Sequence, residues 1–189
     1  MLDKIIIDAD LCIKLGGSSK YTFLKDVLPL VAKEIYVHTQ VKSEVMSPES
    51  ATMQLDELIN AGKVTVVNES NLEPSQQSVF DMTYQMLAGV MMSPLKPNKN
   101  KGEVCSLSYA KAAGIPIFAT DESSLQIIID KYLNTGIDDI TCLRIENIVE
   151  MIKSGEIALT RKIAKLIWRL SRKDVSIFDT KIWPIRKEE

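Results

Sequence analysis

Short apolar runs rich in β-branched residues alternate along this chain with longer segments of helical spacing. The run at 4–9 is typical of a buried strand, and the segment 20–33 repeats apolar residues at helical intervals. Strands that alternate with helices form a parallel sheet with helices on both faces. We therefore expect an α/β protein, a three-layer α/β/α sandwich around a central, mainly parallel sheet.

The same patterns give approximate positions for the elements. Strands are expected at 4–9, 34–38, 64–67, 116–120 and 139–143, with a last strand at 175–178. Helices are expected at 10–15, 20–33, around Val41 and Glu44, and at 49–61, 78–92, 103–113, 122–133, 145–154 and 160–172. Polar residues at 68–77 and the Pro/Lys/Asn-rich segment 93–102 predict loops.

Composition limits the class of protein and its partners. The chain has 189 residues, of which 46% are apolar, enough for a sizeable core. Its formal net charge of −2 means that any attraction to polyanions must be local. No stretch approaches the roughly 20 apolar residues of a membrane span. Because the N-terminus leads straight into a strand, we expect no signal peptide, no membrane partner and a cytoplasmic location.

The cysteines and the single histidine do not predict a zinc site. Cys12, Cys105 and Cys142 are far apart and form no C-x-x-C pair, so they are expected to be buried apolar residues. His38 follows the expected second strand and is expected to be a strand-end residue rather than a catalytic base.

Acidic side chains stand at positions that a parallel sheet would bring to one edge. Asp8 ends the first expected strand, Asp121 follows the strand at 116–120, and Glu103 opens a helix. The carboxyl ends of the strands of an open parallel sheet form the crevice that binds ligands. Asp10 lies two residues after Asp8, so both side chains are expected to leave the same face of the strand.

Each acid also has an ordinary structural interpretation. Asp10 could cap the next short helix, and Asp121 could cap the helix expected at 122–133. The helix dipole favours Glu103 in a first turn without any function. Glu44 on its own is a solvated helical acid.

Converging carboxylates would need a cation. Two unit charges about 4 Å apart repel by roughly 4 kcal/mol at an effective dielectric near 20. Either the pKa values of the acids rise or a cation neutralises the cluster. Oxygen ligands without His or Cys favour Mg²⁺ or Mn²⁺ over Zn²⁺.

Basic residues near these acids are candidate phosphate contacts. Lys96, Lys99 and Lys101 lie in the loop before Glu103 and are candidates for binding RNA. The segment 161–173 is basic on one helical side and apolar on the other, which is also the pattern of a solvated helix face.

The order and spacing of four acidic segments resemble the PIN-domain family of metal-dependent ribonucleases. The segments are Ile5-Ile-Ile-Asp8, Val41-Lys-Ser-Glu44, Gly102-Glu103-Val-Cys-Ser-Leu-Ser-Tyr-Ala110 and Phe118-Ala-Thr-Asp121-Glu122. The resemblance covers residues 3–145 and implies a PIN-like nuclease domain at 1–145. The residues 146–189 look like the C-terminal helical extension of a PIN-like subgroup, and we expect them to pack on the same domain.

The resemblance implies cleavage of single-stranded RNA at a divalent-metal site. Asp8, Glu44, Glu103 and Asp121 match the acidic quartet of the family, and Glu122 falls where members often have another Asp. Asp10 replaces a small hydroxyl or amide residue, and we expect it and Glu122 to be auxiliary metal-site acids. Many small members of the family are toxins that an antitoxin protein inhibits, so an antitoxin is a possible partner of this chain. A homodimer is also a possible assembly.

Two other functions are compatible with the sequence. Asp8-x-Asp10 after an apolar strand also resembles the haloacid-dehalogenase phosphatases, whose first Asp is the nucleophile. That family needs a Ser/Thr at a second strand end and a Lys before a late acidic pair, for which Thr39 and Lys111 are poor matches. Alternatively, the chain is a PIN-like scaffold that binds a partner without cutting it.

Overall fold

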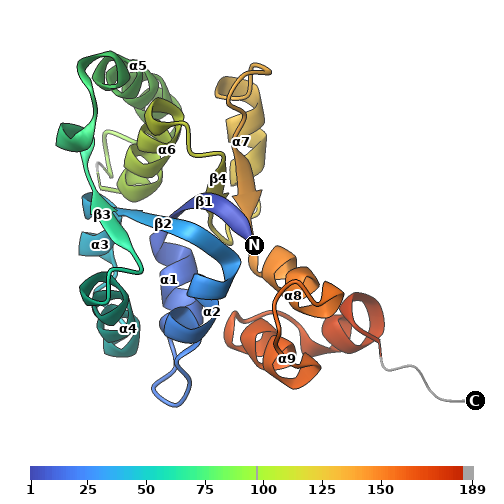
Figure 1. Cartoon of the computed structure of the whole chain (residues 1–189). Coiled ribbons are helices and arrows are strands. Elements are labelled where there is room, and N and C mark those ends of the chain that lie inside the picture. Colours follow the sequence, from blue (N-terminus) through green and yellow to red (C-terminus); the bar gives the residue numbers. More distant parts are fainter. Residues whose placement is uncertain (97, 185–189) are drawn as a thin grey trace, which may run out of the picture.

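The computed structural model describes residues 1–96 and 98–184, and its centre is one five-stranded sheet in the order β3-β2-β1-β4-β5 (Figure 1). The strands are β1 (Leu2–Ile7), β2 (Ala32–His38), β3 (Thr65–Val67), β4 (Ile117–Ala119) and β5 (Thr141–Leu143). All four strand pairings are parallel. The predicted α/β class and central parallel sheet are confirmed.

Helices cover both faces of the sheet and make the three layers (Figure 1). One layer contains α1 (Ala9–Gly16), α2 (Phe23–Val31), α4 (Glu49–Asn60), α8 (Ile145–Ser154) and α9 (Arg161–Leu170). The other contains α5 (Pro74–Met91), α6 (Lys101–Ala113) and α7 (Leu125–Tyr132). The short helix α3 (Thr39–Glu44) follows β2 directly.

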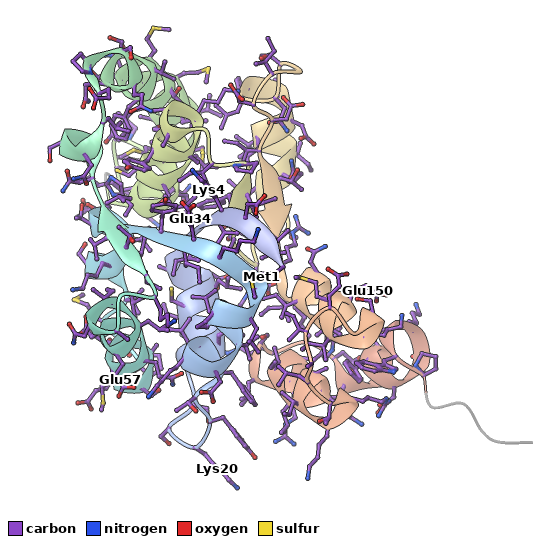
Figure 2. The ribbon with its side chains drawn as sticks, in the orientation of Figure 1. Met1, Lys4, Lys20, Glu34, Glu57 and Glu150 are labelled. Carbon is purple, nitrogen blue, oxygen red and sulfur yellow. The ribbon has the colours of Figure 1, made fainter. Side chains whose placement is uncertain are left out.

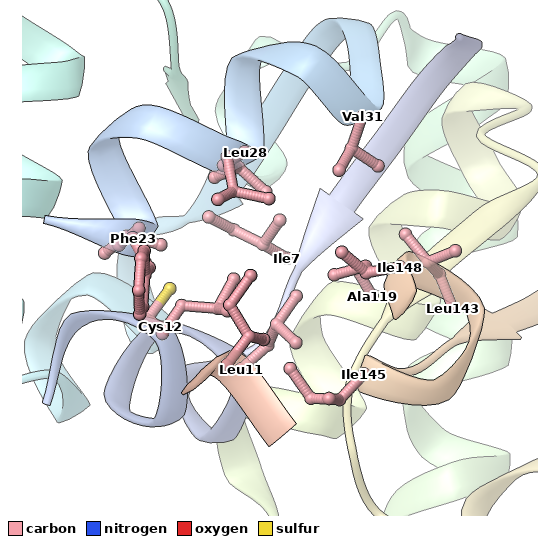
Figure 3. Packing of buried hydrophobic residues seen from close by; sticks show 14 of the residues in the cluster. Ile7, Leu11, Cys12, Phe23, Leu28, Val31, Ala119, Leu143, Ile145 and Ile148 are labelled. Atoms are coloured by element: carbon pink, nitrogen blue, oxygen red, sulfur yellow. The ribbon is translucent and has the colours of Figure 1, made fainter. Parts of the chain in front are cut away.

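The alternation of side chains along β1 divides the interior into two cores. Ile5 and Ile7 point into the first core, and Ile6 points into the second. Figure 3 shows Ile7 beside Leu11 of α1 and Ile148 of α8, so both ends of the chain contribute to the first core. All three cysteines are buried and free, as expected.

The C-terminal segment packs onto this first core. Ile152 of α8 and Ala164, Ile167 and Trp168 of α9 are buried in the same cluster as β1 and α1. Two short helical turns follow, α10 (Val175–Ile177) and the π-helical η2 (Phe178–Ile182). Of the extension expected at 146–189, residues 185–189 lie outside the described part of the chain.

The strand expected at 175–178 is wrong. The side chain of Asp174 accepts a hydrogen bond from the amide of Ser176 at 2.8 Å, which caps a helical turn there. The fully buried Phe178 then packs against Trp168, with ring centroids 5.9 Å apart. A short apolar run can be a strand or a buried turn, and in this case packing against α9 favours the turn.

The segment between β3 and α6 is more helical than expected. A 3₁₀ turn, η1 (Glu69–Asn71), lies inside the loop expected at 68–77, and α5 begins at Pro74 rather than at residue 78. The apolar side chains that share one face of α5 are exposed: Val79, Met82, Met86 and Val90. The helix instead buries Phe80, Thr83 and Leu87.

The amino-terminal halves of β1 and β2 carry an ordinary surface ion pair. Lys4 and Glu34 are cross-strand partners on β1 and β2, and their ion pair measures 3.7 Å (Figure 2). No helix within the described part of the chain combines the length and hydropathy needed to cross a bilayer.

Candidate functional site

The order of the strands reverses between β1 and β4. From β1 the chain moves through β2 to β3 on one side, and it returns on the other side as β4 and β5. Ligands of open α/β sheets bind outside the carboxyl ends of the strands at such a switch point. Asp8 follows β1, and Thr120 and Asp121 follow β4, so the switch point carries polar residues from both strands.

Asp8 is buried at this switch point and is held by two hydrogen bonds. Its side chain is the N-cap of α1 and accepts from the amide of Ala9 at 2.7 Å. The hydroxyl of Thr120 donates to its other oxygen at 3.0 Å. Burial, followed by the negative charge of Glu103, raises the pKa of Asp8 to about 7, although both hydrogen bonds act in the opposite direction. The fold therefore opposes the ionised form of a carboxyl group that it also holds in a fixed orientation.

Asp10 does not share a strand face with Asp8, so that expectation is wrong. β1 ends at Ile7, and Asp10 lies in the first turn of α1. Asp8 ends the strand because its side chain caps the helix. The carboxylate of Asp10 forms an ion pair with Lys14, one helical turn later, at 2.9 Å.

Glu44 lies close to Glu103 because the residue between them in space, Gly102, has no side chain. Gly102 precedes Glu103 in α6, and a Cβ atom at Gly102 would lie only 2.5 Å from a carboxylate oxygen of Glu44. The side chain of Gln40 donates to the other oxygen of Glu44 at 3.0 Å. Burial raises the pKa of Glu103, and the charges of nearby acids, Glu44 first, raise it further. Glu44 and Glu103 therefore lie close enough to repel, as Asp8 and Glu103 do.

Asp121 interacts with lysines rather than with the other acids. Its buried carboxylate lies 2.9 Å from the ammonium of Lys14 and 3.0 Å from that of Lys173, and it accepts from the amide of Ile145 at 3.2 Å. Burial alone would raise the pKa of Asp121, but these hydrogen bonds outweigh it and leave the pKa below its ordinary value. Asp121 is thus neutralised by cations that belong to the chain itself.

The capping role expected for Asp121 is also wrong. The helix expected at 122–133 begins only at Leu125, with Ser124 as its N-cap. Asp121 instead binds the first amide of α8, where the helix dipole favours a negative charge. Glu122 is exposed and accepts a hydrogen bond from the hydroxyl of Ser124 at 2.9 Å.

The carboxylate oxygens of the site are ligands that a hard cation prefers, but they are not gathered into a complete metal-binding group. Among residues 1–96 and 98–184, no three His, Cys, Asp or Glu side chains lie close enough together to form a metal-binding group. Asp8, Glu44 and Glu103 nevertheless offer carboxylate oxygens that form no ion pair with a lysine of the described residues, and such oxygens suit Mg²⁺ or Mn²⁺. For Asp121 to bind a metal, it would first have to release its lysines.

The candidate RNA-binding lysines differ in exposure. Lys96 and Lys99 are exposed in the loop, whereas Lys101 is partly buried as the first residue of α6, two residues before Glu103. Part of the basic side of α9 is already neutralised, because Arg161 and Lys165 both bind Asp179.

The lysine that the phosphatase interpretation needs is far from the acids. Lys111 lies in the last turn of α6, eight residues after Glu103 and therefore about 12 Å along the helix axis. Its ammonium donates to the carbonyl oxygens of Ile137 and Asp138 at 2.9 and 3.1 Å.

Three residues of the site were not predicted. Thr120 had a signal in the sequence, because it ends the strand expected at 116–120 and so falls at the same edge of the sheet as Asp8. Lys14 lies four residues after Asp10 on a helix, which is also a readable pattern. Lys173 had no signal, since 52 residues separate it from Asp121 (173 − 121).

Comparisons with known protein families, with curated proteins and with solved structures gave no match for this chain. The PIN-like interpretation therefore depends on the acidic segments and on where the fold places them.

Proposed function

We propose that this protein is a Mg²⁺- or Mn²⁺-dependent endoribonuclease that cleaves single-stranded RNA, with Asp8, Glu44 and Glu103 as the residues that hold the metal. The observation that carries the proposal is the position of Asp8, a buried carboxyl group at the switch point that Ala9 and Thr120 hold in one orientation, while Glu44 lies against Gly102 beside Glu103. In keeping with this position, burial and the charge of Glu103 raise the pKa of Asp8. A bound cation would offset the free-energy cost of ionising the buried carboxyl group and so favour the ionised carboxylates.

The residues around Asp8 support the chemistry of hydrolysis. A divalent cation bound there would lower the pKa of a water molecule and stabilise the charge that develops on the phosphate. The amide of Ala9 and the hydroxyl of Thr120 hold Asp8 in one orientation, as outer hydrogen bonds do for metal ligands. Water adds to the phosphorus, a P–O ester bond breaks, and one product keeps the phosphate while the other gains a hydroxyl group.

Asp121 has a different part in this proposal from the one its sequence motif implies. It forms ion pairs with Lys14 and Lys173 just beyond the end of β4, and so fixes α1 and the C-terminal segment beside the acidic site. Asp10 and Glu122 are auxiliary acids. A toxin role, an antitoxin partner and a homodimer remain expectations from the PIN resemblance and are not needed for the activity.

The test is cleavage of a labelled single-stranded RNA with Mn²⁺, with Mg²⁺ and with EDTA. We expect cleavage with either metal and none with EDTA. Asp8→Asn and Glu103→Gln should each reduce the rate at least about 100-fold, because even outer-shell residues of metal sites are worth about 10–100-fold. Glu34→Gln is the matched control, since Glu34 is an exposed acid on β2, cross-strand partner of Lys4 and remote from the carboxyl ends.

Other outcomes would identify the competing functions. Release of phosphate from a small monoester, without cleavage of RNA, would replace the proposal with the phosphatase. A folded protein that neither binds Mn²⁺ in a calorimetric titration nor cleaves RNA would be a scaffold.

A further inference from the structure

A second pocket adjoins the candidate site on the side of β2 and α5. It has a volume of about 420 Å³ and is lined by residues that include His38, Gln40, Glu69, Phe80, Tyr84 and Lys101. Gln40 joins the pocket to the acids, because its side-chain amide donates to Glu44 at 3.0 Å. Lys101 joins them as well, since it precedes Gly102, which lies against Glu44.

The pocket contains a buried donor without a partner. The ring of His38 is 2% exposed, and its Nδ1 accepts from the amide of Gln40 at 3.1 Å. A neutral histidine whose Nδ1 is an acceptor carries its hydrogen on Nε2. Within residues 1–96 and 98–184 that Nε2 has no hydrogen-bond partner, because the carboxylate oxygen of Glu69 that lies 3.4 Å away does not form a hydrogen bond with it. Buried donors are normally satisfied, so this one points to a ligand.

One wall of the pocket is aromatic, and its rim is polar. The rings of Phe80 and Tyr84 lie 19° from parallel with centroids 6.0 Å apart, and the ring of His38 lies 13° from parallel with that of Phe80. Nearly parallel rings form a surface on which a flat base can stack. Glu69 and Asp81 outnumber Lys101 among the charged lining residues, which disfavours a phosphate inside the pocket.

We infer that this pocket binds a guanine base of the RNA substrate next to the cleavage site. Guanine is the base whose edge offers two adjacent N–H donors, which suit the two oxygens of the Glu69 carboxylate. Its O6 and N7 acceptors match the Nε2–H of His38 and the ammonium of Lys101. The inference rests on the proposed nuclease function and gives it a base preference.

The test separates base binding from catalysis by measuring binding in EDTA. Calorimetric titrations with 5′-GMP, 5′-AMP, 5′-CMP, 5′-UMP and inorganic phosphate should show the tightest binding for 5′-GMP and none for phosphate alone. Glu69→Gln should weaken 5′-GMP binding about 10-fold or more, since a good bidentate base contact discriminates by roughly that factor. Tyr84→Leu should weaken binding of all four nucleotides, and Glu34→Gln should change none.

The outcomes for this pocket and for the nuclease are distinguishable. Asp8→Asn should lose cleavage but keep 5′-GMP binding, whereas Glu69→Gln should lose both 5′-GMP binding and any preference for guanine beside the cut. Equal binding of the four nucleotides, or an unchanged affinity for 5′-GMP in Glu69→Gln, would overturn the guanine site even if cleavage is observed. Selective 5′-GMP binding without RNA cleavage would support the pocket and reject the nuclease.

Discussion

Asp8 has a carboxyl group whose ionisation the folded protein opposes. Its pKa is raised to about 7, so between the ordinary value of 3.8 and about 7 the folded state binds more protons than the unfolded state. Stability from this group is therefore lost as the pH rises through that window. In EDTA at pH 8, we expect Asp8→Asn to be more stable than the parent by up to a few kcal/mol, since one pKa unit corresponds to about 1.4 kcal/mol. Urea denaturation measures the difference, which should shrink towards pH 4.

Gly102 allows a test that separates the site from the fold. An alanine there would place its Cβ 2.5 Å from an oxygen of Glu44, which is the movable end of a flexible side chain. Alanine favours a helix by about 1 kcal/mol over glycine, so Gly102→Ala should fold normally while it displaces Glu44. We expect cleavage and Mn²⁺ affinity to fall at least about 10-fold, in the range of outer-shell substitutions.

The matched control for this substitution is Gly89→Ala in α5. Apart from the adjacent backbone of α5 itself, no heavy atom of the described residues lies within 4 Å of a Cβ built at Gly89, so this variant should keep full activity. Equal activity of both glycine variants would show that the position of Glu44 does not matter for cleavage.

His38 makes the free energy of unfolding depend on pH with the opposite sign to Asp8. Burial lowers the pKa of its imidazole, so near the ordinary value of 6.5 the unfolded state binds more protons than the folded state. Stability is then present above that value and is lost as the pH falls, by up to about 1.4 kcal/mol per pH unit. His38→Asn keeps a capping acceptor for the amide of Gln40 and should remove this loss between pH 7 and pH 5. Parallel stability curves of the parent and the variant across this range would contradict the prediction.

Elements with a clear periodic pattern were predictable, and those fixed by side-chain contacts were not. The helix expected at 145–154 matches α8 because Ile148, Val149 and Ile152 repeat on one buried face. Sequence alone also placed Asp8 and Asp121 at strand ends. It did not show that Asp8 ends β1 by capping α1, or that α5 turns Met82 and Met86 outward. Both depend on which surface an element meets, and a linear pattern does not contain that information.

The lysine contacts of Asp121 escaped prediction for the same reason. Lys14 comes from α1, and Lys173 comes from the segment after α9, so the contact joins two ends of the chain. In sequence, Lys173 belongs to a basic run that a solvated helix face explains equally well. In the fold it is partly buried and also binds Glu146 at 2.8 Å.

The link between Lys173 and Asp121 should stabilise the attachment of the C-terminal helices. We expect Lys173→Met to reduce the free energy of unfolding by about 1–3 kcal/mol, because it leaves a buried carboxylate with one lysine fewer. With Asp121→Asn in the background, the same substitution should cost at least about 0.5 kcal/mol less, which a double-mutant cycle in urea measures. Lys162→Met, at an exposed position of α9, is the control and should change stability by less than about 0.5 kcal/mol. Additive effects of Lys173→Met and Asp121→Asn would contradict the link.

At the scale of the whole molecule, the site lies between the two hydrophobic cores, which are separate clusters of buried side chains. Helices α1 and α8 pack in the first core, and α6, which carries Glu103, packs in the second. Asp8 follows β1, the strand that contributes side chains to both. The repulsion between Asp8 and Glu103 therefore acts between the two helical layers, across the central sheet.

A cation bound by these acids should consequently stabilise the entire fold. A ligand that binds only the folded state adds about 2.7 kcal/mol when its concentration is 100 times its dissociation constant. We expect Mn²⁺ to raise the melting temperature of the parent in proportion to the logarithm of its concentration once the site is saturated, and EDTA to reverse the rise. Asp8→Asn should start from a higher melting temperature in EDTA and show no rise with Mn²⁺, since it lacks both the repulsion and the ligand. If Mn²⁺ raised the melting temperatures of both proteins equally, the cation would be bound elsewhere and the raised pKa of Asp8 would have a purely structural origin.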